Sequence, residues 1–175
     1  MSRDILFDHE NARFGCRHSA LIVHGDRILL QCPVGTQDYA FIGGHATFGE
    51  TAAETLCREI REELHTTAEI GRMIAVGEVF IDWGHCMDGT PRHCHQVGLY
   101  FLAQVDTAQL PAGDRFIGYD EAGGERFDLE YIWMPVEKLR EITVYPPEVA
   151  RHLLNGAQDV LHFVYSELPG DTRWP

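Results

Sequence analysis

The densest group of charged side chains lies between positions 58 and 63, where the sequence reads REIREE. It places three glutamates, Glu59, Glu62 and Glu63, within two turns of a predicted helix. Like charges three or four residues apart on a helix repel each other, at roughly 0.2–0.5 kcal/mol per pair. A bound cation would remove that cost, and Mg²⁺ commonly takes a few carboxylates together with water and substrate phosphates. The spacing indicates a divalent-cation site, while a solvated Glu-rich face is the alternative.

Glycines stand directly before this acidic segment. Gly43, Gly44 and Gly49 allow the backbone to adopt positive φ angles and to approach a ligand closely. His45 follows the glycine pair and is the histidine best placed to meet a phosphate, and Glu50 adds another carboxylate. A glycine-rich loop alone is a weak indication, but its position before the acidic helix favours a ligand site over a solvated face.

Two helices are predicted, one of which carries the acids of this site. A capping box, Thr51 to Glu54, predicts that the acidic helix begins at about residue 51 and runs to about 65. The second is predicted at about 147–155, because a proline opens it and Gly156 stands just past its end.

Patterns of apolar and branched residues predict the strands. We expect them at 20–23 and 27–32 as a hairpin, at 69–80 with a break at Gly77, at 96–105 and at 129–135. Residues 81–95 are predicted to be a turn-rich excursion, 110–126 a long polar loop, and the chain after Gly156 irregular. Strands, then a helix, then strands and helices favour an α/β fold with a mixed sheet flanked by helices.

The composition narrows the class of protein. A chain of 175 residues predicts one domain, 1–175. A net charge of −13, from 14 basic and 27 acidic residues, argues against a nucleic-acid partner. The sequence shows no secretory signal and no apolar run long enough to span a bilayer. Five dispersed cysteines, Cys16, Cys32, Cys57, Cys86 and Cys94, indicate a reduced, cytoplasmic protein rather than a disulfide framework.

Residues 44–66 resemble the signature of the Nudix hydrolase superfamily, G-x5-E-x7-R-E-U-x-E-E-x-G-U, in which U is apolar. The matching positions are Gly44, Glu50, Arg58, Glu59, Ile60, Glu62 and Glu63. Two positions at the helix exit depart from the signature, since His65 replaces the last glycine and Thr66 replaces the final apolar residue. The resemblance implies an α/β/α sandwich around a mixed sheet.

The resemblance also implies an activity and roles for the residues. The family hydrolyses a pyrophosphate bond in a nucleoside diphosphate linked to another moiety, using Mg²⁺ or Mn²⁺ as cofactor. The substrates of the family are small diphosphate compounds, and a homodimer is compatible with the resemblance. Carried over by position, the metal ligands are the Gly44 carbonyl, Glu59, Glu62 and Glu63, with Glu50 supporting them. The catalytic residues are Arg58, Glu59 and Glu62, and the substrate-binding residues are Gly43, Gly44 and His45.

Several alternatives stay open at this level. The general base is expected to be Glu62 or Glu59, with Asp120, Glu121 and Glu125 of the predicted loop as further candidates. A non-hydrolytic Nudix-fold nucleotide sensor is the alternative function, although a binding module has no evident need for every catalytic acid. ADP-ribose, other nucleotide sugars and nucleoside triphosphates are not distinguished.

Two further groups of residues have more than one interpretation. The segment 85–95 holds His85, Cys86, His93, Cys94 and His95, which are zinc-ligand types at a spacing that matches no usual zinc module. Aromatic side chains can stack on a nucleobase or pack in the core. Those considered for stacking are Tyr39, Phe41, Trp83 and Tyr119.

Overall fold

A computed structural model describes residues 4–87, 89–122 and 125–168, leaving aside the side chains of residues 121–125. Within that part of the chain, eleven strands form one mixed sheet, and two α-helices and two short 3-10 helices accompany them. The α/β class with a mixed sheet is therefore confirmed. No helix among the described residues is long and apolar enough to cross a membrane.

The strands are β1 (Leu6–His9), β2 (Ala12–His24), β3 (Arg27–Pro33), β4 (Tyr39–Ala40), β5 (Ile42–His45), β6 (Ala68–His85), β7 (Pro91–Val105), β8 (Arg115–Ala122), β9 (Glu125–Pro135), β10 (Val144–Tyr145) and β11 (Leu161–Ser166). The helices are α1 (Ala52–Leu64), η1 (Thr107–Gln109), η2 (Val136–Arg140) and α2 (Pro147–Leu154).

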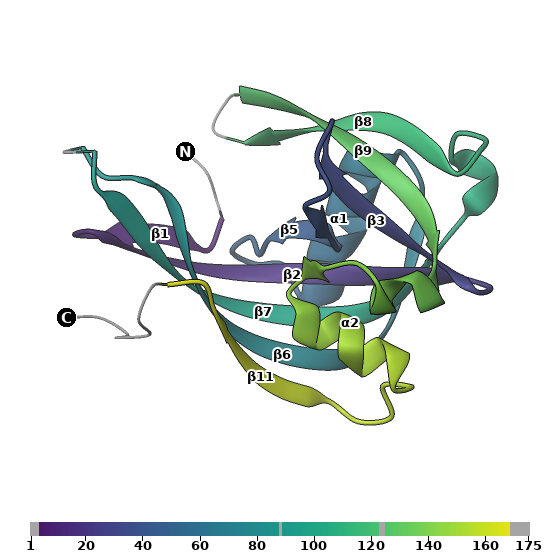
Figure 1. Cartoon of the computed structure of the whole chain (residues 1–175). Coiled ribbons are helices and arrows are strands. Elements are labelled where there is room, and N and C mark those ends of the chain that lie inside the picture. The colour runs from purple at the N-terminus through teal and green to yellow at the C-terminus, as the bar shows by residue number, and fades with distance from the viewer. Residues whose placement is uncertain (1–3, 88, 123–124, 169–175) are drawn as a thin grey trace.

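The sheet runs in the order β10-β4-β3-β2-β7-β6-β11, with β1 and β5 also paired to β2, and β9 joining β3 to β8. Strands β2 and β7 are parallel, as are β6 and β11 and the short pair β4 and β10. The remaining pairs are antiparallel. In Figure 1, α1 lies behind the sheet and α2 in front of it.

Each face of the sheet has its own core because side chains alternate along a strand. Behind the sheet, Leu56 and Ile60 of α1 pack in one cluster with Ile22 of β2. In front of it, Val149 of α2 packs with Leu21 of β2. This arrangement confirms the predicted sandwich of two helical layers around a sheet.

Helix positions agree closely with the predictions from sequence, whereas several strands do not. Residues 81–95 are the outer part of a long β6–β7 hairpin, with Asp82 opposite His93. Residues 110–126 contain β8 and the start of β9 rather than a polar loop. After Gly156, Leu161–Ser166 forms β11 instead of remaining irregular, and the expectation for residues 169–175 lies outside the described part of the chain.

The predicted break at Gly77 is wrong, because β6 continues through this residue. It lies in continuous pairing with Gly98 of β7 and Phe163 of β11. A Cβ at Gly77 would lie 2.2 Å from the Phe163 ring. The glycine is therefore needed to seat an aromatic ring on the sheet, not to interrupt the strand.

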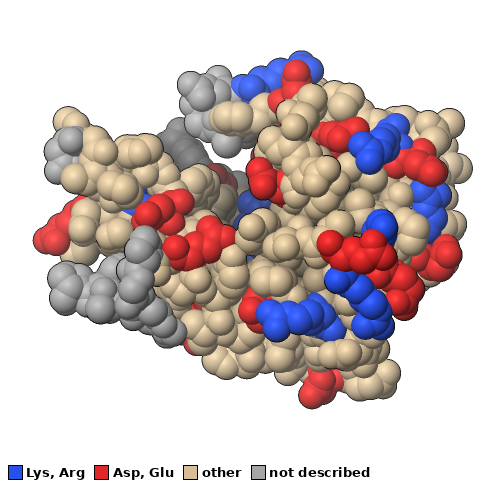
Figure 2. All heavy atoms as spheres, viewed as in Figure 1, with Lys and Arg blue, Asp and Glu red and all other residues tan. Residues whose placement is uncertain are grey.

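Acidic side chains are spread over the face shown in Figure 2, with Lys and Arg interspersed among them. No continuous basic patch is visible on that face. This distribution agrees with the excess of acidic residues in the sequence.

Candidate active site

The acidic helix begins where the sequence predicts. The Thr51 backbone amide donates to the Glu54 carboxylate (2.8 Å), and the Glu54 amide donates back to the Thr51 hydroxyl (3.3 Å). This reciprocal capping box sets the first turn of α1 beside the glycine loop. The loop itself continues directly from β5, which pairs with β2 at Gly43 and Gly44.

Both glycines of the pair are required by close contacts. Gly43 has a φ of 149°, and a Cβ there would lie 2.1 Å from the His18 carbonyl oxygen. A Cβ at Gly44 would lie 2.2 Å from the carboxyl carbon of Glu59. The Glu59 carboxylate therefore lies directly against the Gly44 backbone, in a space that any larger residue would fill.

Glu63 is the most buried acid of the site, with 6% of its surface exposed. The Tyr131 hydroxyl of β9 donates to its carboxylate at 3.0 Å. Burial raises the pKa of Glu63 to about 8, and the nearby charges of Asp120 and Glu59 contribute to the rise. Burial also raises the pKa of Glu59, against the opposing effect of Arg58. Without a cation, these two carboxylates are held in surroundings that disfavour their charge.

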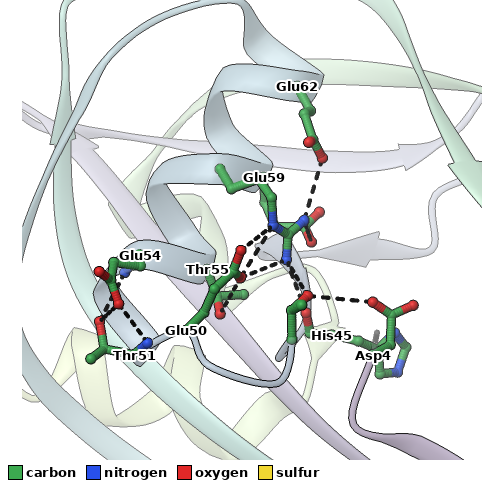
Figure 3. Close-up of polar contacts among 10 residues, drawn as sticks. Asp4, His45, Glu50, Thr51, Glu54, Thr55, Glu59 and Glu62 are labelled. Carbon is green, nitrogen blue, oxygen red and sulfur yellow. Dashed lines mark hydrogen bonds and ion pairs between the residues drawn. The ribbon is translucent and has the colours of Figure 1, made fainter. Parts of the chain in front are cut away.

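Arg58 connects the helix to the loop. Its guanidinium donates hydrogen bonds to Glu50 (3.1 Å) and to Glu59 (2.6 Å), and a longer one to Glu62 (3.3 Å). Figure 3 shows these three carboxylates around the one guanidinium. Burial disfavours the charge of Arg58, but hydrogen bonds and attraction from Glu50 and Glu59 outweigh it and raise its pKa. Arg58 also donates to the loop at Thr47 (3.1 Å).

Glu50 faces this guanidinium and also accepts a hydrogen bond from the Thr55 hydroxyl at 3.1 Å. Its position makes it a support for Arg58 and the loop.

Glu62 is less enclosed than the other two glutamates of the predicted cation site. Its side chain is 61% exposed, whereas that of Glu59 is 12% exposed. Figure 3 shows Glu62 one turn further along α1 than Glu59. The buried pair is therefore Glu59 and Glu63, and Glu62 stands at the solvent edge.

Helix α1 ends at the two positions that depart from the signature. His65 adopts the left-handed conformation, with φ 55° and ψ 30°, and its amide donates to the Arg61 carbonyl (3.1 Å). Thr66 is buried, and its hydroxyl donates to the Asp106 carbonyl at 3.0 Å. His65 thus takes the backbone conformation that glycine favours, and the Thr66 hydroxyl is hydrogen-bonded in place of an apolar contact.

Two neighbours of the site were not identified from the sequence. Arg17 of β2 donates to the Gly43 carbonyl, and its charge opposes the burial that raises the pKa of Glu59 and Glu63. Tyr131 of β9, fully buried, holds Glu63. The sequence gives little signal for Arg17, which precedes the predicted strand 20–23 and lies within β2, and nothing local distinguishes Tyr131 from a core tyrosine.

Other predicted candidates fall in different places. Asp120 lies on β8 within electrostatic reach of Glu63. The side chains of Glu121 and Glu125 lie outside the described part of the structure. His45 stacks on Trp83 with ring centroids 5.1 Å apart, and burial lowers its pKa to about 4.

Two histidines of the segment 85–95 have partners other than a metal, and one of its cysteines is buried. His93 pairs with Asp82 at 2.7 Å, His95 stacks on Phe80 at 4.5 Å, and Cys94 is buried. Over the described residues, no three His, Cys, Asp or Glu side chains form a ready-made metal cluster.

The donor set around α1 nevertheless fits a hard divalent cation. It consists of oxygen atoms alone, from Glu59, Glu63 and the Gly44 backbone; the Glu63 carboxylate is buried and the Glu59 carboxylate is largely buried. Mg²⁺ sites commonly use one or two carboxylates and complete their coordination with water and substrate phosphates. Such a site needs no closed cage of protein side chains.

A mixed sheet between two helices, with a glycine loop leading into an acidic helix, defines an α/β protein of the Nudix type. The model of the NUDIX domain matches residues 17–154, and the chain belongs to this family.

Solved structures of the same fold include a NUDIX hydrolase from Nitrosomonas europaea, at 13% identity and a TM-score of 0.55, covering 87% of this chain and 79% of that one. The MutT protein from Methanosarcina mazei shares 17% identity at a TM-score of 0.54, over 83% of this chain and 96% of that one. An ADP-ribose pyrophosphatase from Streptococcus suis shares 14% identity at a TM-score of 0.51, over 87% and 98%. At these identities the likeness shows the fold.

Proposed function

We propose that the protein is a divalent-cation-dependent hydrolase that cleaves the pyrophosphate bond of a nucleoside diphosphate linked to another moiety. The observation that supports this most directly is the pair Glu59 and Glu63. Both carboxylates are largely buried, one against the Gly44 backbone and one on Tyr131, in surroundings that disfavour their charge. Arg58 offsets the charge of Glu59 only in part, because burial still raises the Glu59 pKa, and a cation shared by Glu59 and Glu63 would stabilise both carboxylates.

In this proposal Glu59, Glu63 and the Gly44 carbonyl hold the metal, and Glu62 contributes directly or through water. Bound Mg²⁺ or Mn²⁺ neutralises charge on the phosphates and lowers the pKa of a bound water. Arg58 keeps Glu59 in position, and Glu50 keeps Arg58 in position. The glycine loop, with His45, lies against the phosphates.

Hydrolysis forms one bond from the water oxygen to phosphorus and breaks the bond from that phosphorus to the bridging oxygen. Glu62 or Glu59 accepts the proton that the water loses. Glu62 suits this role through its exposure, since a carboxylate at the solvent edge can release the proton again. The departing phosphate carries the electron pair of the broken bond.

The substrate is proposed to be ADP-ribose, another nucleotide sugar or a nucleoside triphosphate. The structural neighbour from Streptococcus suis is an ADP-ribose pyrophosphatase, which supports including the first of these. We also propose that the protein is soluble and cytoplasmic. A homodimer is compatible with the proposal.

The test is a panel of these compounds, assayed with Mg²⁺, with Mn²⁺ and with a chelator. We expect turnover with the metals only, and a loss of about 10²-fold or more in kcat for Glu63→Gln, because one metal-holding oxygen becomes an amide. The amide still accepts from Tyr131, so the fold is retained. Glu69→Gln, an exposed acid on β6, is the matched control.

Full metal-dependent activity in Glu63→Gln would contradict the proposed role of that residue. Tight nucleotide binding with no turnover of any compound would favour the nucleotide sensor instead.

A further inference from the structure

A cavity of about 500 Å³ lies beside the β8–β9 hairpin, where β9 also pairs with β3 (Figure 1). Gln31 and Pro33 of β3 line it together with Asp120, Phe127 and Leu129 of the hairpin, and it is called the hairpin cavity below. Its volume is within the range of small-molecule sites.

Strand pairing places the lining side chains of the hairpin on two faces. Side chains opposite each other on paired strands share a face, and neighbours along a strand alternate. Asp120 stands opposite Phe127. Leu129, two positions further along β9, stands opposite Gly118. A Cβ at Gly118 would lie 3.5 Å from the Glu63 carbonyl oxygen, so this inner face of the hairpin turns toward α1.

The outer face holds the one basic side chain among the described residues that line the cavity. Arg126 and Asp128 alternate with the inner residues, and their side chains pair at 3.2 Å. The Arg126 guanidinium also lies 4.0 Å from the centroid of the Tyr119 ring. Arg126 is therefore engaged on the outer face and does not neutralise the inner one.

Gln31 brings a buried polar group to the inner face. It stands opposite Tyr131, which follows Leu129 by two positions on β9. Gln31 is 9% exposed, and its Oε1 atom is buried with no hydrogen-bond partner among the described residues. Burying such an oxygen unpaired costs about 1–3 kcal/mol. The amide can turn about its last bond and present either atom to the cavity, so a ligand that donates a hydrogen bond would remove that cost.

Polar groups thus stand at both ends of the inner face, with apolar groups between them. Gln31 marks one end and Asp120 the other, because their partners on β9 are at positions 131 and 127. Leu129 and Pro33, which stand opposite each other, lie between these ends. Phe127, opposite Asp120, leaves 46% of its surface exposed. The shape suits a short apolar stem with a polar group at each end.

Charge distinguishes the two ends. Asp120 is the only charged side chain on the inner face among the described residues that line the cavity, and its charge also acts on Glu63. An anion there would be repelled by both acids, whereas an ammonium group would form charge-assisted hydrogen bonds with Asp120. The ring of Phe127 also attracts positive charge. At Gln31 an uncharged donor is favoured, because a second ammonium would be buried without a carboxylate on that part of the inner face.

We propose that the hairpin cavity binds a small amphipathic amine, with its ammonium group at Asp120, its apolar stem against Leu129 and an uncharged hydrogen-bond donor at Gln31. A purely apolar ligand would leave the Gln31 oxygen without a donor. A ligand with hydroxyls along its whole length would bury them against Leu129 and Pro33. The inference goes beyond the proposed function and does not depend on it.

The test is a titration of the ¹⁵N-labelled full chain, followed by NMR in the presence of a chelator. The probes are 5-amino-1-pentanol and its six- and seven-carbon homologues. Each is compared with the alkylamine that lacks the hydroxyl and with the diol that lacks the charge. We expect at least one amino alcohol to bind about tenfold or more tightly than its diol and about fivefold more tightly than its alkylamine. The Gln31 side-chain amide signal should shift with the amino alcohol.

Two variants separate the two ends of the ligand. Asp120→Asn should remove the preference for the amino alcohol over the diol, and Gln31→Met should remove its preference over the alkylamine. Asp26→Asn and Gln104→Met are the matched controls, because both residues are exposed and neither lines this cavity. Both controls should bind like the wild type.

Thermal unfolding verifies that each variant is folded. If Gln31→Met does not fold, Phe127→Ala takes its place and should weaken every probe several-fold, whereas Ile117→Ala, which replaces an exposed side chain of the same hairpin, should not.

Three results would overturn the inference: no binding of any amino alcohol, equal binding of amino alcohol and diol, or unchanged preferences in the folded variants. Since no step needs turnover, these outcomes are independent of the diphosphatase assay. A chain that hydrolyses diphosphates but ignores the amines keeps the proposed function and loses this site. A chain that binds the amine and hydrolyses nothing keeps the site and loses the activity.

Discussion

Glu63 illustrates how much the surroundings of one residue decide. Its neighbours Glu62 and Glu59 on the helix are chemically identical to it, yet Glu62 is 61% exposed at the side chain and Glu63 is almost fully buried. The difference comes from Tyr131 and Asp120, which the β8–β9 hairpin brings to one side of α1. At the residue scale, the site consists of ordinary carboxylates in unequal surroundings.

The raised pKa of Glu63 predicts a pH dependence of stability in the metal-free protein. Its carboxyl titrates near 4.5 when unfolded and near 8 when folded, so between these values the folded state holds a proton that the unfolded state has lost. Raising the pH from about 4.5 to 8 should therefore lower the free energy of unfolding, by about 2–4 kcal/mol from this group.

Chemical denaturation at several pH values, with a chelator present, measures this effect. Glu63→Gln should flatten the dependence, because its amide does not titrate. Mg²⁺ should stabilise the wild type more at pH 8 than at pH 5, since binding requires the charged carboxylate. A Glu63→Gln profile parallel to that of the wild type would show that another group is responsible.

At the scale of the element, α1 has a well-capped N-terminus and a strained C-terminus. The capping box sets its first turn, and the buried stripe with Leu56 and Ile60 holds it on the sheet. At its end, His65 occupies a left-handed conformation that costs a non-glycine residue about 1 kcal/mol. The departure of His65 from the family signature therefore affects how the helix terminates, not which acids it presents.

His65→Gly is expected to stabilise the protein by about 0.5–1 kcal/mol, because glycine adopts positive φ without strain and only part of the gain is lost to its flexibility when unfolded. Urea denaturation measures the change. Glu141→Gly is the control, since Glu141 caps η2 with an ordinary φ of −109° and should gain nothing. Destabilisation by His65→Gly would mean that the His65 side chain makes a contribution larger than the strain.

At the scale of the whole molecule, β11 is the strand at one edge of the sheet and joins the C-terminal segment to the core. It pairs in parallel with β6 over six residues. Phe163 packs in the same cluster as α2 and lies over Gly77. The strand also brings Tyr165 to the cavity that Arg17, His45 and Trp83 line, so the outer layer of the fold and this cavity depend on the same segment.

Phe163→Ala should lower the free energy of unfolding by about 3–5 kcal/mol, because it removes a buried ring that Gly77 cannot replace. Val164→Ala is the control on the same strand, since Val164 is 40% exposed, and should cost less than about 1 kcal/mol. Both are measured by denaturant unfolding. Similar losses for the two variants would indicate that pairing of the strand, not packing of the ring, holds β11.

The elements that were predicted well are those whose signals are local. The Thr51 to Glu54 capping box and Pro147 located both helices to within about one residue, because caps act through neighbours in sequence. The β2–β3 hairpin followed from a Gly-Asp turn, although β2 extends further than its apolar run. The strand β11 was missed because its pairing partner, β6, lies far away in the chain. The strand β8 was missed because its sequence, RFIGYDEA, contains Gly118 and several polar residues, although it pairs with the adjacent β9.

The sequence by itself determined the family signature, the position of α1 and the set of glycines and acids on it, because spacing along one helix and its loop is a local property. Only the tertiary structure decided which of those acids are buried and what surrounds them. Tyr131 and Asp120 come from the β8–β9 hairpin and Arg17 from β2, far apart in the chain, and only the assembled sheet places them around Glu59 and Glu63. Burial and charge act through space, so they follow from the assembled sheet and not from the order of residues.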